Sequence, residues 1–75
     1  MSHSEQEHLV QMLNQIVENN ISYGDETAVS EVVASHVKKF WPRRMKQMLN
    51  DCVAQGGGEL HPIAVLAANR LQQAS

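Results

Sequence analysis

The chain has 75 residues, one cysteine and a formal net charge of −2 at pH 7. This length predicts a single domain, residues 1–75, with a small core near the limit of independent stability. One cysteine excludes an intrachain disulfide framework and favours a reducing compartment. The N-terminus lacks a basic segment followed by an apolar run, and no apolar run reaches the roughly 18–20 residues of a membrane helix. Neither a signal peptide nor a membrane association is therefore predicted.

Charge is distributed unevenly along the chain. Residues 1–37 carry −6, residues 38–46 carry +5 and residues 47–75 carry −1. Such a dipolar layout can orient a docking partner. The alternative is that acidic and basic helices simply face each other or water, since isolated surface ion pairs contribute little.

The first predicted helix covers roughly residues 5–20. Ser4 and Glu7 have the spacing of a capping box, in which each side chain accepts a hydrogen bond from an early backbone N–H. Apolar residues then recur in steps of three and four and form one stripe: Leu9, Met12, Leu13, Ile16 and Val17. A polar segment ending in Gly24 closes this helix.

The second predicted helix starts after Asp25, a favourable N-cap residue, and runs to Phe40 or Trp41. Its apolar stripe is the most regular in the chain: Val29, Val32, Val33, His36, Val37 and Phe40. The stripe predicts that Phe40 is buried. It also predicts that His36 is a core histidine with a hydrogen-bond partner rather than a metal ligand, because buried polar groups are normally satisfied.

The third predicted helix begins at Pro42 or Arg43, because proline ends the preceding helix and suits a first helical turn. Its stripe comprises Met45, Met48, Leu49, Cys52 and Val53. The run Gly56–Gly58 ends it, since glycine readily adopts the left-handed conformation that follows a helix.

The fourth predicted helix begins at Pro62, with His61 before it as a poor N-cap. Its stripe comprises Ile63, Leu66, Ala67 and Leu71, and residues 72–75 are expected to fray. No alternating apolar pattern predicts a strand. The predicted fold is therefore all-α, a small four-helix bundle with short connections.

The sequence offers no catalytic, cofactor-binding or metal-binding set. His3 and His8 miss the spacing that places two ligands on one helix face. Cys52 lies on an apolar stripe and is expected to be a small buried residue. Gly56–Gly58 lacks the lysine and hydroxyl residue of a phosphate loop, so a turn is predicted there. No serine is accompanied by a recognisable base and orienting group.

A corner between two helices, residues 36–46, holds the only Phe, the only Trp and five of the six Lys and Arg residues. Trp and Arg often carry binding energy at protein interfaces. The hypothesis for partner binding therefore includes six residues: Lys38, Lys39, Trp41, Arg43, Arg44 and Lys46. The alternative is that Trp41 belongs to the core and the arginines are solvated. The same cations form at most a weak nucleic-acid patch, because the whole chain is acidic.

Four segments, in this order, resemble the delta subunits of bacterial NAD-dependent, molybdenum-containing formate dehydrogenases. They are residues 9–16 (LVQMLNQI), 36–41 (HVKKFW), 44–46 (RMK) and 57–62 (GGELHP). Among the departures from the family pattern, Pro42 follows Trp41 directly, and His61 stands where a small hydroxyl residue is usual.

The resemblance implies a cytoplasmic, non-catalytic accessory subunit or assembly factor whose partners are larger formate dehydrogenase subunits. Molybdopterin, iron–sulfur and flavin groups would belong to those subunits, and this chain would carry no cofactor. The isolated chain is expected to self-associate or to be marginally stable. The alternative function is a free-standing helical module that binds another protein or, less expected, nucleic acid.

Overall fold

The computed structural model describes residues 3–74, except for the side chains of residues 3, 4 and 74. The elements are α1 (His3–Asn20), the 3₁₀ turn η1 (Ile21–Tyr23), α2 (Glu26–Phe40), α3 (Arg43–Ala54) and α4 (Pro62–Ala74). The described residues contain no strand, and the expected all-α fold with four helices is confirmed. The expected Ser4–Glu7 capping box involves the Ser4 side chain, which lies outside the described part. Ser75 also lies outside it, whereas Gln72 and Gln73 are still helical rather than frayed.

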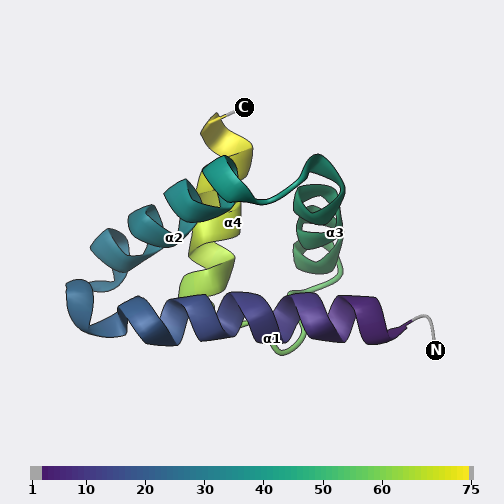
Figure 1. Ribbon diagram of the computed structural model, residues 1–75, viewed down its shortest axis with the longest axis horizontal. Helices are drawn as coiled ribbons and strands as arrows, with labels where there is room; N and C mark the ends of the chain where they lie inside the picture. Colours follow the sequence, from purple (N-terminus) through teal and green to yellow (C-terminus); the bar gives the residue numbers. More distant parts are fainter. Residues whose placement is uncertain (1–2, 75) are drawn as a thin grey trace.

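The helices are not all parallel or antiparallel to one another. Figure 1 shows α1 running across the base of the molecule, with α3 and α4 standing roughly upright above it and α2 sloping across α4. The α2–α4 pair has the most extensive packing. Interaxial distance depends on the side chains at the contact, so small residues on α4 allow a close approach to α2. The buried small residues of α4 are Ala64, Ala67 and Ala68.

The predicted starts of α2, α3 and α4 are confirmed, two of them by side-chain caps. The Ala28 N–H donates to Asp25 Oδ1 over 2.9 Å at the start of α2. The Ile63 N–H donates to His61 Nδ1 over 3.1 Å, so His61 caps α4. Pro42 precedes α3 in an extended conformation, with φ −68° and ψ 158°. These boundaries depend on local chemistry, which explains why the sequence predicts them.

The α3–α4 connection is held against α1 by one side chain. Asn14 Nδ2 donates to the Glu59 carbonyl over 2.9 Å, and the His61 N–H donates to Asn14 Oδ1 over 2.8 Å. The amide thus satisfies two backbone groups of a loop more than 40 residues away in sequence. This link positions the start of α4 relative to α1.

The glycine run after α3 turns through positive φ angles: 108° at Gly56, 84° at Gly57 and 53° at Gly58. The Gly56 N–H donates to the Val53 carbonyl and the Gly57 N–H to the Cys52 carbonyl, both over 3.0 Å. These bonds satisfy carbonyls at the end of α3 that have no partner within the helix. Gly57 is also buried.

Replacing Gly57 by alanine is expected to lower the free energy of unfolding by about 1–2 kcal/mol, because side-chain-bearing residues are strained in the left-handed region. An added Cβ would lie 3.5 Å from Val65 Cγ2, an ordinary contact, so the expected cost comes from the backbone. Urea unfolding followed by circular dichroism measures it. Gln55→Ala, in the same connection at φ −87°, is the control and should change stability by less than about 0.5 kcal/mol. Equal effects of the two substitutions would contradict the argument.

The buried face of α2 differs from the predicted stripe. Its buried residues are Val29, Ser30, Val33, Ala34 and Val37, and Trp41 continues the same row after the helix. Phe40 is 71 % exposed and His36 is exposed, so the expectations of a buried Phe40 and a core His36 are both wrong. The chain leaves helical geometry at Trp41, with φ −84° and ψ 137°. The Trp41 side chain therefore enters the core where the helix ends, and Phe40 stays outside.

The other stripes are confirmed in part. On α1, Leu9, Leu13 and Val17 are buried, whereas Met12 is exposed. On α3, Leu49 and Cys52 are buried, and the remaining predicted residues, Met45, Met48 and Val53, pack partly buried against the core. On α4 the exposed Leu66 is a further departure, because the buried side is occupied by alanines instead.

A polar link joins α2 to α4 inside this packing. Ser30 is 1 % exposed; its Oγ donates to the Thr27 carbonyl over 2.8 Å and accepts from Arg70 Nε over 2.9 Å. Arg70 Nη1 also lies 3.5 Å from Glu31 Oε2. The buried hydroxyl is therefore fully satisfied, as buried polar groups normally are.

Candidate partner-binding corner

The corner between α2 and α3 is tight. The Trp41 N–H still donates to the Val37 carbonyl over 3.0 Å, and the Lys46 N–H donates to the Pro42 carbonyl over 3.1 Å. Only Trp41 and Pro42 separate the last residue of α2 from the first residue of α3. The break predicted from Pro42 is confirmed, and it gathers the basic residues of both helix ends at one place.

Trp41 is only 7 % exposed and belongs to the hydrophobic core. Its indole is covered by neighbouring side chains of the core rather than exposed at the surface. For this residue the structure matches the alternative interpretation, a core tryptophan.

Two of the five cations at the corner serve the fold. Arg44 Nη2 lies 3.1 Å from Glu5 Oε1 and 3.2 Å from Glu5 Oε2, which joins α3 to α1. Both side chains are largely exposed, so the pair contributes at most about 1 kcal/mol. Lys46 Nζ donates to the Lys38 carbonyl over 2.8 Å and thereby satisfies a carbonyl in the last turn of α2.

The other three cations are not neutralised by the fold. Lys38, Lys39 and Arg43 are exposed, and their side chains form no ion pair or hydrogen bond with the described residues. Three positive charges therefore face solvent within six positions of the sequence.

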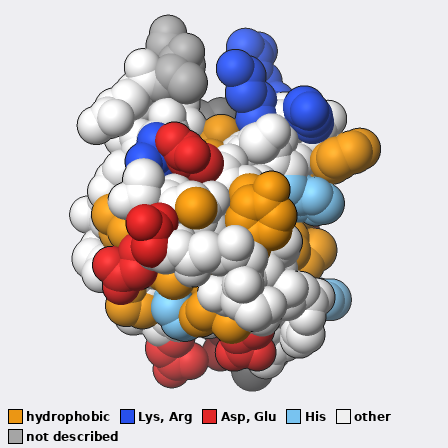
Figure 2. Space-filling model, turned by 90° about the vertical axis from the view of Figure 1, so that its left-hand side faces the viewer, with side chains coloured by type: hydrophobic (Ala, Val, Ile, Leu, Met, Phe, Trp, Pro, Cys, Tyr) orange, Lys and Arg blue, Asp and Glu red, His pale blue; other side chains and the backbone are white. Residues whose placement is uncertain are grey.

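Phe40 lies among these cations, and sequence reasoning did not identify it as a surface residue. Its ring centroid is 5.0 Å from that of His36, with the planes tilted by 44°. Residues four apart share a helix face, so the two exposed rings support each other. Figure 2 shows cationic side chains, a protruding hydrophobic group and a histidine along the upper right, with acidic side chains at the bottom and farther left. The sequence did contain a signal for the buried face of α2, because Val29, Val33, Val37 and Trp41 recur in uninterrupted steps of four. Phe40 lies outside this row.

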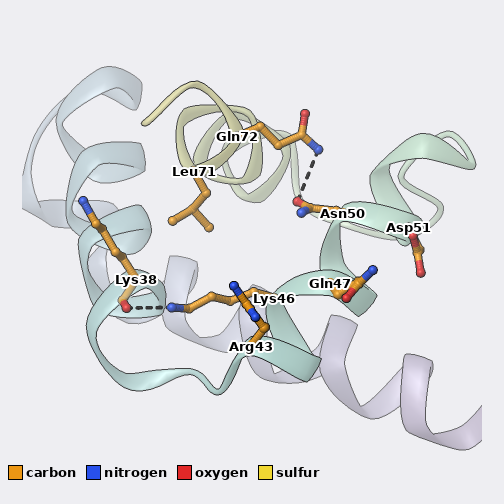
Figure 3. Close-up of a pocket in the computed structure, with 8 residues that line it drawn as sticks. All are labelled: Lys38, Arg43, Lys46, Gln47, Asn50, Asp51, Leu71 and Gln72. Carbon is orange, nitrogen blue, oxygen red and sulfur yellow. Dashed lines mark hydrogen bonds between the residues drawn. The ribbon is translucent and has the colours of Figure 1, made fainter. Parts of the chain in front are cut away.

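An open groove of about 460 Å³ adjoins the corner and is shown in Figure 3. Its lining comes from the end of α2, from α3 and from the end of α4: Lys38, Arg43, Lys46, Gln47, Asn50, Asp51, Leu71 and Gln72. Lys46 reaches across it to the Lys38 carbonyl, and Leu71 points into it from α4. Three cations and one carboxylate line the groove, so its net charge is positive.

The sequence matches the family described as NADH-dependent formate dehydrogenase delta subunit FdsD over residues 8–68, well over half of the chain. The chain belongs to this family. No curated protein and no solved structure matches the chain significantly. The matched range includes the whole corner, the glycine turn and the first half of α4.

For this delta-subunit family member, the described residues contain no group of three or more His, Cys, Asp or Glu side chains that could hold a metal ion. Cys52 is buried, with Sγ 3.9 Å from the Gly57 carbonyl oxygen, which confirms its expected place in the core. None of the described helices combines the length and the apolar character needed to cross a membrane. What the corner offers chemically is a surface with positive charge and an exposed aromatic ring.

Proposed function

We propose that this chain is a non-catalytic accessory subunit of a bacterial, cytoplasmic NAD-dependent formate dehydrogenase. In this proposal it binds the larger subunits and stabilises the complex or assists its assembly. The family match over residues 8–68 carries the proposal. Redox chemistry would belong to the larger subunits, and this chain would contribute binding surface.

The character of the corner supports a binding role. Monomeric proteins commonly expose single apolar residues, but here a largely exposed phenylalanine lies among three unpaired cations. Charged and aromatic residues of this kind supply specificity and anchoring at protein interfaces. The groove beside them is open, as a surface for a partner segment requires.

The proposal is tested by deleting the gene for this chain in its native host and by tagging the chain in a second strain. The tagged chain is expected to co-purify with the larger subunits, and the deletion is expected to lower the yield of assembled, active complex. Equal molar amounts of this chain and the large subunit in the purified complex favour a structural role. A smaller molar amount of this chain than of the large subunit favours an assembly role. Recovery of the tagged chain alone, together with undiminished formate oxidation in the deletion strain, would overturn the proposal.

A further inference from the structure

We infer that the corner patch, defined as Lys38, Lys39, Phe40 and Arg43, docks onto an acidic segment of a larger subunit that holds an apolar pocket for the Phe40 ring. This inference rests on the proposed function and names the surface that carries it. It differs from the sequence-based hypothesis by including Phe40 and excluding Trp41, Arg44 and Lys46.

The first argument is the contrast between neighbouring aromatic residues. Trp41 is 7 % exposed and already belongs to the core, whereas Phe40 is 71 % exposed at the end of a regular helix. His36 contacts the Phe40 ring and limits its freedom. A ring that is held in place before binding loses little conformational entropy when a partner covers it. Phe40 is thus the best-prepared anchor at the corner.

The second argument is charge. The fold uses Arg44 to pair with Glu5 and Lys46 to cap α2. Lys38, Lys39 and Arg43 remain around the ring without a partner among the described residues. A partner surface complementary to these three cations must carry carboxylates. The Arg43 guanidinium has the forked donors that bind a carboxylate through two hydrogen bonds.

The third argument is the continuity of the patch with the groove. Lys38 and Arg43 belong to both, and Leu71 supplies an apolar wall inside the groove (Figure 3). A partner segment lying over Phe40 can therefore place further side chains in the groove. The combined surface extends from α2 across α3 to α4.

A second copy of this chain is a poorer occupant. On α2 itself, Glu31 is already paired with Arg70. Glu26 and the N-cap residue Asp25 lie at the opposite end of this 15-residue helix, about 20 Å from the patch. Contact between the basic end of one copy and the acidic end of the next would be head-to-tail, and such contacts give open chains unless they happen to close. An acidic segment of a different subunit requires no such arrangement.

The test measures the affinity of the full chain for the complex purified from the deletion strain. Phe40→Ala is expected to weaken binding at least tenfold, because a buried phenylalanine side chain contributes strongly to association. Its control is Tyr23→Ala, since Tyr23 is a similarly exposed aromatic residue, 70 % exposed, before the other end of α2. Tyr23→Ala should bind like the wild type.

The charge argument is tested with a second pair of variants. Lys38→Gln/Lys39→Gln is expected to weaken binding and to reduce its dependence on salt concentration, because exposed charges are screened by salt. Gln11→Glu/Gln15→Glu changes the net charge by the same amount on exposed positions of α1 and should leave affinity nearly unchanged. Circular dichroism melting curves establish that all four variants are folded.

The outcomes separate this inference from the proposed function. If the wild-type chain does not bind the complex, the proposed function fails. If the wild type binds and both patch variants bind equally well, the inference is overturned while the subunit role stands. If sedimentation shows wild-type oligomers that Phe40→Ala converts to monomers, with binding to the complex unchanged, the patch binds a second copy and the inference is also overturned.

Discussion

Replacing Trp41 by alanine is expected to remove much of the stability of the isolated chain, whereas replacing Phe40 by alanine should leave stability nearly unchanged. Trp41 is 7 % exposed within the core, and truncating a buried tryptophan costs about 3–5 kcal/mol. A 75-residue domain typically has only about 4–11 kcal/mol of stability in total. Phe40 is 71 % exposed, so its truncation should cost about 0.5 kcal/mol or less.

Thermal unfolding of the two variants, followed by circular dichroism, measures this contrast. Trp41→Ala should melt at least about 12 °C below the wild type, since each kcal/mol shifts the midpoint by roughly 4–8 °C in a domain of this size. The melting temperature of Trp41→Phe should lie between those of Trp41→Ala and the wild type, because phenylalanine retains part of the buried aromatic surface. A larger loss of stability in Phe40→Ala than in Trp41→Ala would show that Phe40, and not Trp41, fills the core.

The second large effect is expected at Leu49. Leu49 on α3 is completely buried, whereas Leu66 on α4 is 41 % exposed, although both lie on apolar stripes of the sequence. Leu49→Ala should lower the free energy of unfolding by about 2–5 kcal/mol through lost burial and the cavity that remains. Leu66→Ala removes the same atoms from a site open to water, and its expected cost is below about 1 kcal/mol.

Urea unfolding of the two leucine variants provides the measurement, with the midpoint and the slope determined separately. The slopes should agree, because a change in slope would report an altered unfolded state rather than lost packing. The two variants share the same chemical change, so the difference between them isolates burial. Similar losses in both would contradict the observed packing of α3 and α4.

Local sequence signals are enough to predict where the helices begin and end. Pro42 removes an N–H and sets the start of α3, and Asp25 and His61 cap the helices that follow them. The glycines after α3 take up positive φ angles that other residues avoid. Each of these effects acts within a few residues, so it can be predicted without knowing what lies nearby in space.

Which part of each apolar stripe is buried depends on the packing of the helices in three dimensions. The α2 stripe contains Phe40 as well as Val37, but the core extends only to the row that ends in Trp41. Helical periodicity predicts the direction of a side chain, whereas its burial depends on where neighbouring helices lie and where its own helix stops. The same reason explains why Leu66 is exposed while Ala64 and Ala68 are buried.

The candidate site was likewise predictable from the sequence only in part. The sequence predicted a basic corner around Pro42, because five cations lie within nine residues of the chain. Only the structure separates them by role: Arg44 pairs with Glu5, 39 positions away, and Lys46 caps α2. Lys38, Lys39 and Arg43 have no partner within the part of the chain that the structure describes. Ion pairs and caps between distant segments depend on how the helices are placed in space, and the spacing of charges along one helix does not contain that information.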